Sequence, residues 1–345
     1  MVRIADFDYE LPEDRIAQTP IEPRDTARLL VDRGSAPPEH RRVTDLPELL
    51  RAGDLLVLNE TRVIPARLRL RRSTGGAAEV LLLEPRDTER RTWEALVRPG
   101  AKLRVGEHLL ADDVPLVRMG ERTPAGDTFW VELIGDDDPV ALLDRHGEMP
   151  LPPYIGERLN DPDRYQTVFA REPGSAAAPT AGLHFTSELF ERLAAVGVRT
   201  ATVELVVGLD TFQPISTENP LDHPMHTERY RVPPETMAAC RAADRVVAVG
   251  TTAVRALESA ARSGELSGRT DLFIHRGFDW QLVDVMMTNF HLPKTTLLMM
   301  IDAFVGPRWR DLYAVALADD YRFLSFGDAM LLDRHARATS ATVDQ

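Results

Sequence analysis

The stretch Val246-Val247-Ala248-Val249-Gly250-Thr251-Thr252-Ala253 joins an apolar run to a helix-like segment through one glycine and two threonines. The apolar run favours a buried strand, and the residues that follow, up to 263, favour a helix. Backbone N–H groups at the start of such a helix can hold an anion such as a carboxylate, and Arg255 could add a bidentate contact. An ordinary helix with a threonine cap explains the same residues. The stretch therefore predicts a strand and a helix whose junction either binds an anion or is simply capped.

The same rhythm of strand and helix continues on both sides of this stretch, which is the pattern of α/β domains. Helices are expected at residues 46–51, 187–195, 253–263 and 295–304. Strands are expected at residues 54–58, 199–207, 246–249 and 272–275.

A different pattern occupies residues 67–134, where short β segments alternate with turn residues as in a small barrel or sandwich. These segments are expected at residues 67–71, 79–83, 93–97, 102–105 and 129–134. We therefore predict an α/β fold in which residues 1–60 and 151–345 form the main domain. Residues 61–150 are expected to form an inserted β-rich domain.

The length of 345 residues makes two domains the default, and the net charge of −13 bears on possible partners. This charge argues against unspecific attraction to nucleic acid, so an RNA substrate would need a local basic surface. Arg67, Arg69 and Arg71 would share one face of their strand. They form either such a surface or a merely solvated face of the barrel.

Several features favour a cytoplasmic location. The single cysteine, Cys240, has no partner for an intramolecular disulfide, which fits a reducing compartment. The first ten residues lack the apolar run of a secretory signal, and no stretch approaches the roughly 20 apolar residues of a membrane span. We expect a soluble protein without a membrane partner, as a monomer or weak homo-oligomer.

The densest polar motif is Thr288-Asn289-Phe290-His291-Leu292-Pro293-Lys294, just before an expected helix. It places an amide, an imidazole and an ammonium at a strand-to-helix junction, which makes Asn289, His291 and Lys294 candidate catalytic residues. Of the 41 basic residues only Lys102 and Lys294 are lysines, so Lys294 is a candidate for a place that needs a compact ammonium. A buried, hydrogen-bonded His291 and a solvated Lys294 are the structural alternative.

Two further stretches carry polar residues. Residues 179–186 follow a run of small residues that would let the backbone approach a ligand, although the stretch could equally be a linker. His223 and His226, with Glu228 nearby, superficially suggest a metal site. Pro224 argues against a shared helical face and no cysteines complete a ligand set, so we expect a polar substrate loop and no metal.

Long motifs run along nearly the whole chain. They include Asp6-Phe7-Asp8-Tyr9-Glu10-Leu11-Pro12, Asn59-Glu60-Thr61-Arg62, Arg164-Tyr165-Gln166-Thr167-Val168-Phe169 and Gly250-Thr251-Thr252-Ala253-Val254-Arg255, together with residues 174–186, 226–230, 288–299 and 321–330. In these motifs the chain resembles the S-adenosylmethionine:tRNA ribosyltransferase-isomerases of queuosine biosynthesis.

The resemblance implies a defined reaction and fold. The ribosyl group of S-adenosylmethionine would be transferred and isomerised onto 7-aminomethyl-7-deazaguanine in the anticodon wobble position of tRNA, giving epoxyqueuosine with loss of adenine and methionine. The implied fold is an α/β domain with an inserted six-stranded β-barrel. Neither a metal nor a permanently bound cofactor is implied, because S-adenosylmethionine is consumed as the donor substrate and tRNA is the partner.

Such a reaction removes a proton beside the sulfonium, so it needs a general base. His291 or His184 is the expected base, because a histidine works near neutral pH. Thr251, Thr252 and Arg255 are expected to hold the methionine carboxylate. Lys294 is expected to face a phosphate or a developing charge, and Asp284 or Glu228 to attend the sulfonium or the incoming amine. Further substrate contacts are expected from Thr180, Gly182, His226, Tyr230, Arg62, Tyr165 and Gln166.

Some positions depart from the family pattern. Val206 stands where the family usually has a histidine, and Asp210 where it has a glycine. Glu60 replaces an aspartate, and His275-Arg276 replace a tyrosine and a proline. If the missing histidine serves as a base or contacts the acceptor, the protein acts on another 7-deazapurine or acceptor, or is a weakened enzyme. A non-catalytic RNA-binding protein is the third alternative.

Overall fold

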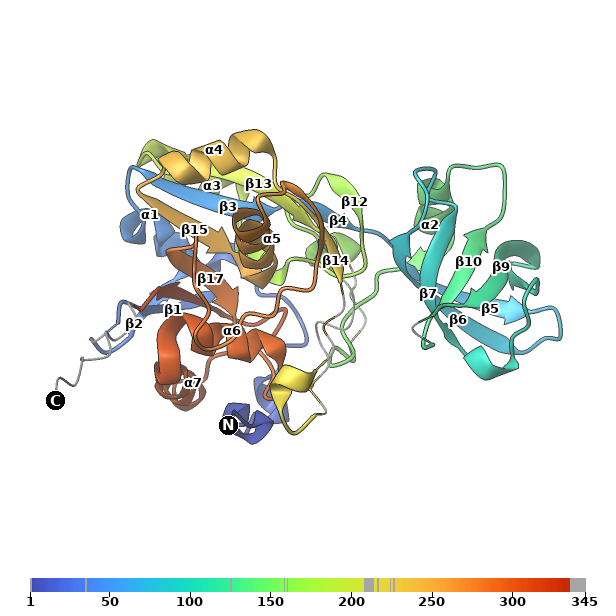
Figure 1. Cartoon of the computed structure of the whole chain (residues 1–345), viewed down its shortest axis with the longest axis horizontal. Coiled ribbons are helices and arrows are strands. Elements are labelled where there is room, and N and C mark those ends of the chain that lie inside the picture. Colours follow the sequence, from blue (N-terminus) through green and yellow to red (C-terminus); the bar gives the residue numbers. More distant parts are fainter. Residues whose placement is uncertain are drawn as a thin grey trace.

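Two β structures of different kinds lie side by side along the long axis of the molecule (Figure 1). The computed structural model describes residues 2–34, 36–124, 126–157, 159, 161–207, 214–215, 217–223, 225 and 227–335. The larger part is built on a sheet of nine strands, and the smaller part on a closed barrel of six. The predicted α/β fold with an inserted six-stranded barrel is confirmed.

The nine-stranded sheet has a parallel centre. In spatial order its strands are β16 (Ser267–Thr270), β14 (Glu228–Arg231), β13 (Arg199–Leu205), β3 (Asp54–Asn59), β15 (Arg245–Val249), β17 (Val285–Asn289), β18 (Ala329–Asp333), β1 (Arg28–Asp32) and β2 (Glu39–Arg42). Strands β13, β3, β15 and β17 run parallel, so their carboxyl ends meet at one edge. Strand β18 is antiparallel to β17 and therefore begins at that same edge.

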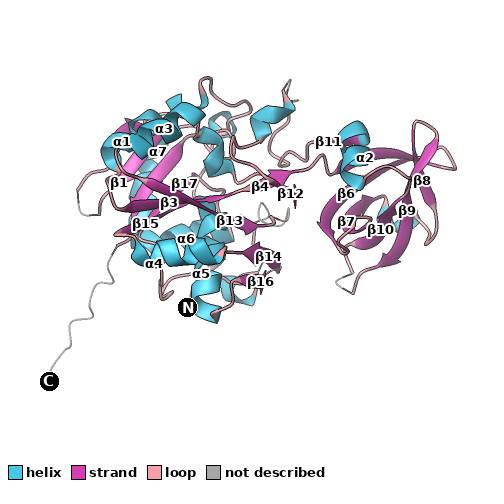
Figure 2. Cartoon of the chain, turned by 90° about the horizontal axis from the view of Figure 1, so that it is seen from above, coloured by secondary structure: helices cyan, strands magenta, loops and turns pink. Residues whose placement is uncertain are grey.

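Helices cover both faces of the sheet (Figure 2). Successive side chains of a strand point to opposite faces, and in β15 Val246 and Ala248 enter one core while Val247 and Val249 enter the other. The first core is covered by α4 (Pro234–Ala242), α5 (Gly250–Ser263) and α6 (Thr296–Val305), and the second by α1 (Leu46–Leu49) and α3 (Ser187–Ala195). Helix α7 (Trp309–Ala318) packs against α6 and β1.

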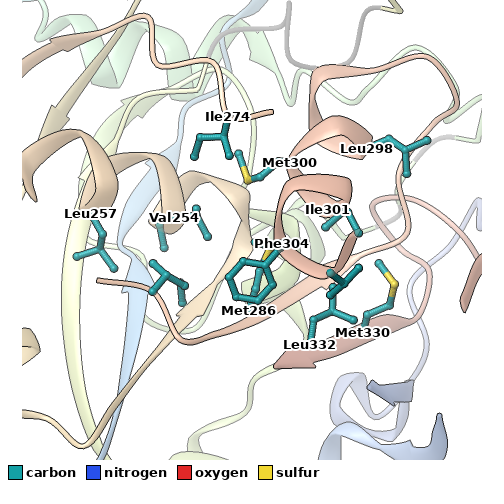
Figure 3. Packing of buried hydrophobic residues seen from close by; sticks show 14 of the residues in the cluster. Val254, Leu257, Ile274, Met286, Leu298, Met300, Ile301, Phe304, Met330 and Leu332 are labelled. Carbon is teal, nitrogen blue, oxygen red and sulfur yellow. The ribbon is translucent and has the colours of Figure 1, made fainter. Parts of the chain in front are cut away.

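The first core is dense and fixes the positions of the two helices that flank the site. Val254 of α5, Phe304 of α6 and Met286 of β17 gather in it (Figure 3), and all three are at most 1% exposed. Burial of such side chains is worth about 1.5–3 kcal/mol each. Packing against this core therefore fixes the start of α5 and the end of β17 relative to each other.

The barrel consists of six antiparallel strands. In spatial order they are β5 (Arg67–Arg72), β6 (Ala77–Pro85), β7 (Thr92–Arg98), β10 (Phe129–Leu133), β9 (Val114–Arg122) and β8 (His108–Ala111), with the short β11 (Gly147–Glu148) beside β5. Pairing of β5 with β8 closes the barrel. Alternate residues such as Leu68, Leu70 and Trp93 fill the interior. Helix α2 (Pro139–His146) is not among the predicted helices.

Two predicted strands are wrong. Lys102 ends a short 3-10 helix, Gly100–Lys102, and residues 103–105 lead into a turn at Gly106, so the segment does not pair as a strand. Residues 272–275 are not a strand either, because β16 ends at Thr270 and the Thr270 hydroxyl accepts a hydrogen bond from the Leu272 N–H. Ile274 is instead buried in the first core.

A small two-stranded sheet lies between the two parts. Strand β4 (Thr61–Val63) pairs in parallel with β12 (Glu172–Ser175), outside the barrel. The amide of Gln166 donates to and accepts from the backbone of Val63 at 3.0 and 2.9 Å, which fixes this junction. No helix in the part of the chain that the structure describes is long and apolar enough to cross a membrane.

Candidate active site

The carboxyl edge of the parallel strands is lined by the polar motifs that the sequence singled out. A cavity of about 50 Å³, which we call the edge cavity, lies there. Its lining includes Thr180, Thr251, Thr252, Thr288, Asn289, His291, Val207, Tyr154 and Ser325. In open α/β sheets this edge is the usual place for a ligand. Small-molecule pockets are usually about 300–1,000 Å³, so a nucleoside-sized ligand requires the lining to move apart.

The start of helix α5 forms one wall of the edge cavity. Gly250 adopts a φ of +86°, a conformation that glycine adopts without strain, and turns the chain from β15 into the helix. The N-cap residue is Val249, and no side chain caps the first turn, so the prediction of a threonine cap is wrong. The Thr252 hydroxyl is buried and has no hydrogen-bond partner. This wall therefore presents backbone N–H groups and a hydroxyl to an anion.

Asn289 is the centre of a hydrogen-bond network at the end of β17. Its side-chain oxygen accepts from the Thr180 hydroxyl at 2.9 Å. Its amide nitrogen lies 3.3 Å from His184 Nε2 and 3.4 Å from the Asp328 carbonyl oxygen. The amide is 3% exposed, and these partners fix its orientation.

His184 lies behind Asn289 rather than in the edge cavity. It is 4% exposed in the 3-10 helix Thr180–His184, where its ring also hydrogen-bonds to the backbone of Arg24. Because Asn289 donates to Nε2, the proton of the neutral ring is on Nδ1. Burial lowers the pKa of His184 to about 4. The ring is therefore neutral, and both of its nitrogens are engaged.

His291 lies in the edge cavity itself. Its Nε2 is 2.9 Å from the Thr288 hydroxyl. Its backbone is fixed from both sides, because the Tyr9 hydroxyl donates to its carbonyl at 2.5 Å and its N–H donates to Tyr313 at 2.9 Å. Burial lowers the pKa of His291 to about 3. Of the two candidate bases, the geometry favours His291.

The depressed pKa values predict that the protein loses stability in mild acid. In the unfolded chain a histidine takes up a proton below about pH 6.5, whereas folded His184 stays neutral down to about pH 4. Stability is therefore complete above pH 6.5 and falls with pH by up to about 1.4 kcal/mol per unit for His184. His291 adds to the loss in the same direction.

Urea unfolding between pH 7.5 and 5 measures this dependence. We expect His184→Gln to be less stable at pH 7.5 but to show a flatter decline below pH 6.5. The control is His108→Gln, which changes an exposed barrel histidine and should leave the slope unchanged. An unaltered slope in His184→Gln would contradict the assignment of a neutral, buried ring.

Lys294 does not line the edge cavity. Its ammonium is 2.8 Å from the Asp8 carboxylate, and both side chains are more than two-fifths exposed. The residue has a φ of +58°, which is uncommon for a residue other than glycine. Its N–H donates to the Phe7 carbonyl and its carbonyl accepts from Ile215. Lys294 thus connects the N-terminal segment at Phe7 with the segment at Ile215. Its position gives no support for the predicted contact with a phosphate.

Arg255 and Glu228 form a buried ion pair between α5 and β14, each with 7% of its surface exposed. Neither lines the edge cavity. The Nε and Nη2 atoms of Arg255 are buried without a hydrogen-bond partner, and burial lowers its pKa to about 10. Tyr230 is buried beside this pair, and its hydroxyl donates to the Glu265 carbonyl at 3.0 Å. The positive charge of Arg255 thus compensates the negative charge of Glu228. This argues against the predicted role of Arg255, which was to hold the methionine carboxylate of the donor.

The predicted role of Asp284 at the site is wrong. It precedes β17 at the end opposite to Asn289, where it accepts from the Val246 N–H at 3.0 Å and from Arg334 at 3.2 Å. Five residues of strand separate the two ends by about 16 Å. Asp284 therefore lies too far from the edge cavity to attend a sulfonium bound there.

Other predicted contacts serve packing. Gly182 lies against Phe169, whose ring would be 2.8 Å from an added Cβ. Tyr165 is fully buried with its ring edge on Phe326. Gln166 holds β4 through its hydrogen bond with the backbone of Val63, and Arg62 is exposed on the same strand. None of these lines the edge cavity.

Two predicted positions, His226 and Asp210, lie outside the described residues. The lining residues that were not predicted include Tyr154 and Ser325, whose hydroxyls are 2.7 Å apart. Ser325 belongs to the motif at residues 321–330, which was the available signal. Among the described residues no group of three or more histidine, cysteine, aspartate or glutamate side chains is placed to hold a metal.

The fold and the edge cavity define the class as an α/β protein with a polar cavity at the carboxyl edge of its sheet and a β-barrel beside it. Residues 4–332 match the family model described as queuosine biosynthesis protein. The chain is 52% identical to the S-adenosylmethionine:tRNA ribosyltransferase-isomerase of Symbiobacterium thermophilum, covering 96% of this chain and 100% of that protein. The Moorella thermoacetica enzyme of the same name is 51% identical with the same coverage.

A solved structure of S-adenosylmethionine tRNA ribosyltransferase from Thermotoga maritima is also similar. It is 39% identical, with a TM-score of 0.54, and the match covers 95% of this chain and 99% of that one. The chain belongs to the queuosine biosynthesis family of S-adenosylmethionine:tRNA ribosyltransferase-isomerases.

Proposed function

We propose that the protein transfers and isomerises the ribosyl group of S-adenosylmethionine onto 7-aminomethyl-7-deazaguanine in the wobble position of a tRNA anticodon. The products are epoxyqueuosine-tRNA, adenine and methionine. Membership of the family supports the reaction, and the edge cavity supports the place of the donor. S-adenosylmethionine is a substrate here and no permanently bound group is required.

The observation that carries the donor site is the uncapped start of α5 with the free Thr252 hydroxyl. A carboxylate is the negatively charged group of the methionine part of the donor, and it fits backbone N–H groups at a helix start. Thr251 and Thr252 line the cavity there, while Asn289 and His291 line it from β17. The donor would thus lie across the carboxyl ends of β15 and β17, with its reacting ribose towards His291.

His291 is proposed to accept the proton that leaves the carbon beside the sulfonium. Its low pKa keeps the ring neutral, and so able to accept a proton, across the physiological range. The same burial weakens the imidazole as a base, so the acidity of the carbon beside the sulfonium must contribute to the transfer. Asn289, held by His184 and Thr180, is proposed to orient the ribose.

Thr252→Val should raise the KM for S-adenosylmethionine by roughly ten-fold to 100-fold, because a hydrogen bond to a charged group contributes about 1.5–3 kcal/mol. The turnover number should change less, since the carboxylate is remote from the reacting carbon. Thr167→Val is a matched control, because the Thr167 hydroxyl is also buried without a partner but lies outside the cavity lining. Equal donor affinities in the two variants would argue against a carboxylate at the start of α5.

Transfer of isotope from the ribose of labelled S-adenosylmethionine into tRNA tests the reaction class directly. Label in tRNA supports the transferase, while donor binding without transfer to any acceptor would overturn it. A non-catalytic RNA-binding protein would show no S-adenosylmethionine binding by calorimetry. An enzyme for another acceptor remains the second candidate, because Val206 stands in place of the usual histidine.

A cytoplasmic location is proposed because the tRNA substrate is found there. The expected monomer or weak homo-oligomer stays a prediction, which sedimentation can check. The division into residues 1–60 with 151–345 and an inserted domain of 61–150 also stays a prediction, supported by the barrel strands between residues 67 and 148.

A further inference from the structure

A second hollow lies between the barrel and the outer strands of the large sheet. It measures about 680 Å³, and we call it the barrel-side groove. Arg90, at the β6–β7 turn of the barrel, lines one side. Residues of β12, β13, β14 and β16 line the other. An ion pair at 2.7 Å between Arg269 of β16 and Glu84 of β6 connects the two sides.

The groove and the edge cavity are separated by a single step of the chain. Val206 lines the groove, and its neighbour Val207 lines the edge cavity. The Val206 N–H donates to the Arg229 carbonyl at 2.9 Å, and the Val207 N–H lies 3.2 Å from the Ser175 hydroxyl oxygen. Two adjacent residues at the end of β13 therefore line the two hollows, which makes the groove a neighbour of the edge cavity.

The lining of the groove carries two carboxylates, Glu204 and Glu172. Glu204 of β13 hydrogen-bonds to Arg231 at 2.7 Å, and Glu172 of β12 lies on the same lining. The pKa of Arg231 is raised, chiefly by this hydrogen bond, and the charges of Glu204, Glu172 and Glu60 add to the rise. The lining as a whole places two carboxylates, those of Glu204 and Glu172, beside the guanidinium groups of Arg90, Arg229, Arg231 and Arg269. Glu172 is exposed, so its carboxylate can meet a cationic group of a ligand.

The arginines of barrel strand β5 and those on the lining of the groove differ in their partners. In the predicted stripe of Arg67, Arg69 and Arg71, Arg69 is paired with Glu148 and Arg71 with Asp113, and the neighbouring Arg72 is paired with Glu107. Two of the three arginines of the stripe are thus already paired with carboxylates. Arg229, exposed on β14, and Arg90 lie instead on the lining of the groove. Nearby, Gly268 has no side chain to obstruct a planar ring.

We propose that the barrel-side groove binds the acceptor nucleotide, with Glu204 and Glu172 contacting its aminomethyl group and the donor groups of its guanine-like edge. Arg229 and Arg90 contact the flanking phosphates. This assignment rests on the proposed function, which supplies the identity of the acceptor. The amine is cationic and the guanine edge presents N–H donors, which carboxylates accept. An open groove also suits a nucleotide that has left the base stack of an anticodon loop.

The test is binding of two anticodon stem-loops, one with 7-aminomethyl-7-deazaguanine and one with guanine at the wobble position. The unaltered chain should prefer the amine-bearing stem-loop, and Glu204→Gln with Glu172→Gln should lower that preference by about ten-fold or more. Calorimetry should show an unchanged affinity for S-adenosylmethionine. The control is Glu39→Gln, which removes the partner of Arg41 on β2 at the opposite edge of the sheet.

The outcomes separate this assignment from the reaction itself. A preference that survives both substitutions would overturn the groove as the acceptor site, even if adenine is still released. Loss of S-adenosylmethionine affinity in the groove variants would overturn it too, because the groove would then hold the donor. Failure of the unaltered chain to transfer ribose, with the amine preference intact, would overturn the proposed reaction and leave the groove assignment standing.

Discussion

Replacing His291 by alanine is expected to lower kcat by roughly 100-fold or more, because a positioned general base contributes about 10²–10⁴-fold. The affinity for S-adenosylmethionine should change little, since the proposed contact of the donor carboxylate is at the uncapped start of α5. His291 is the imidazole that lines the edge cavity, with its backbone fixed by Tyr9 and Tyr313. Single-turnover rates with saturating donor and modified tRNA measure the effect.

The companion variant is His184→Gln, which changes the imidazole behind Asn289. A glutamine amide can still accept a hydrogen bond from Asn289, so this variant should lose much less activity than His291→Ala. The pH profile of kcat should also lack a limb near pH 6.5, because the folded pKa of His291 is about 3. Near-normal turnover of His291→Ala, or a large loss confined to His184→Gln, would contradict His291 as the base.

Arg255→Met should lower the free energy of unfolding by about 3–5 kcal/mol, because breaking a buried ion pair by removing one partner is strongly destabilising. Arg255 and Glu228 are each 7% exposed, and Arg255 Nη1 donates to the Glu228 carboxylate between α5 and β14. Urea denaturation gives the change from the shift of the midpoint. The KM for S-adenosylmethionine should stay within about three-fold in the folded variant.

The double variant Arg255→Met with Glu228→Leu provides the control. Replacing a whole buried ion pair by apolar residues is often neutral, so the double variant should recover much of the stability. If Arg255→Met were as stable as the parent but had a much higher KM for the donor, the guanidinium would be a carboxylate ligand. In that case the ion pair would not be its main role.

Local sequence signals predicted the elements that have their own periodicity. The helix at 187–195 and the strand and helix around Gly250 lie where the apolar spacing indicated. The hairpin of β8 and β9 was missed although Asp112 and Asp113, with φ of 47° and 68°, form a turn that aspartates tolerate. Helix α2 was also missed, although Asp138 caps it and Pro139 occupies its first turn.

Roles that depend on distant partners could not be predicted from the sequence. His184 and His291 looked alike there, and only the fold shows that Asn289 engages one while the other lines the cavity. The sequence also does not show that the Lys294 ammonium pairs with the carboxylate of Asp8, which lies 286 positions earlier. Asp284 and Asn289 are five positions apart, yet strand direction places them at opposite ends of β17. The sequence motifs predicted the region of the site. The tertiary contacts show which side chains of that region line the edge cavity.

Adenine release tests the central claim most directly. The purified chain is incubated with S-adenosylmethionine and one of three acceptors: tRNA with 7-aminomethyl-7-deazaguanine, the free base, or tRNA with guanine at the wobble position. We predict adenine release only with the modified tRNA, matched mole for mole by epoxyqueuosine in that tRNA. Release with the free base at an equal or higher rate, or no release with the modified tRNA, would contradict the account.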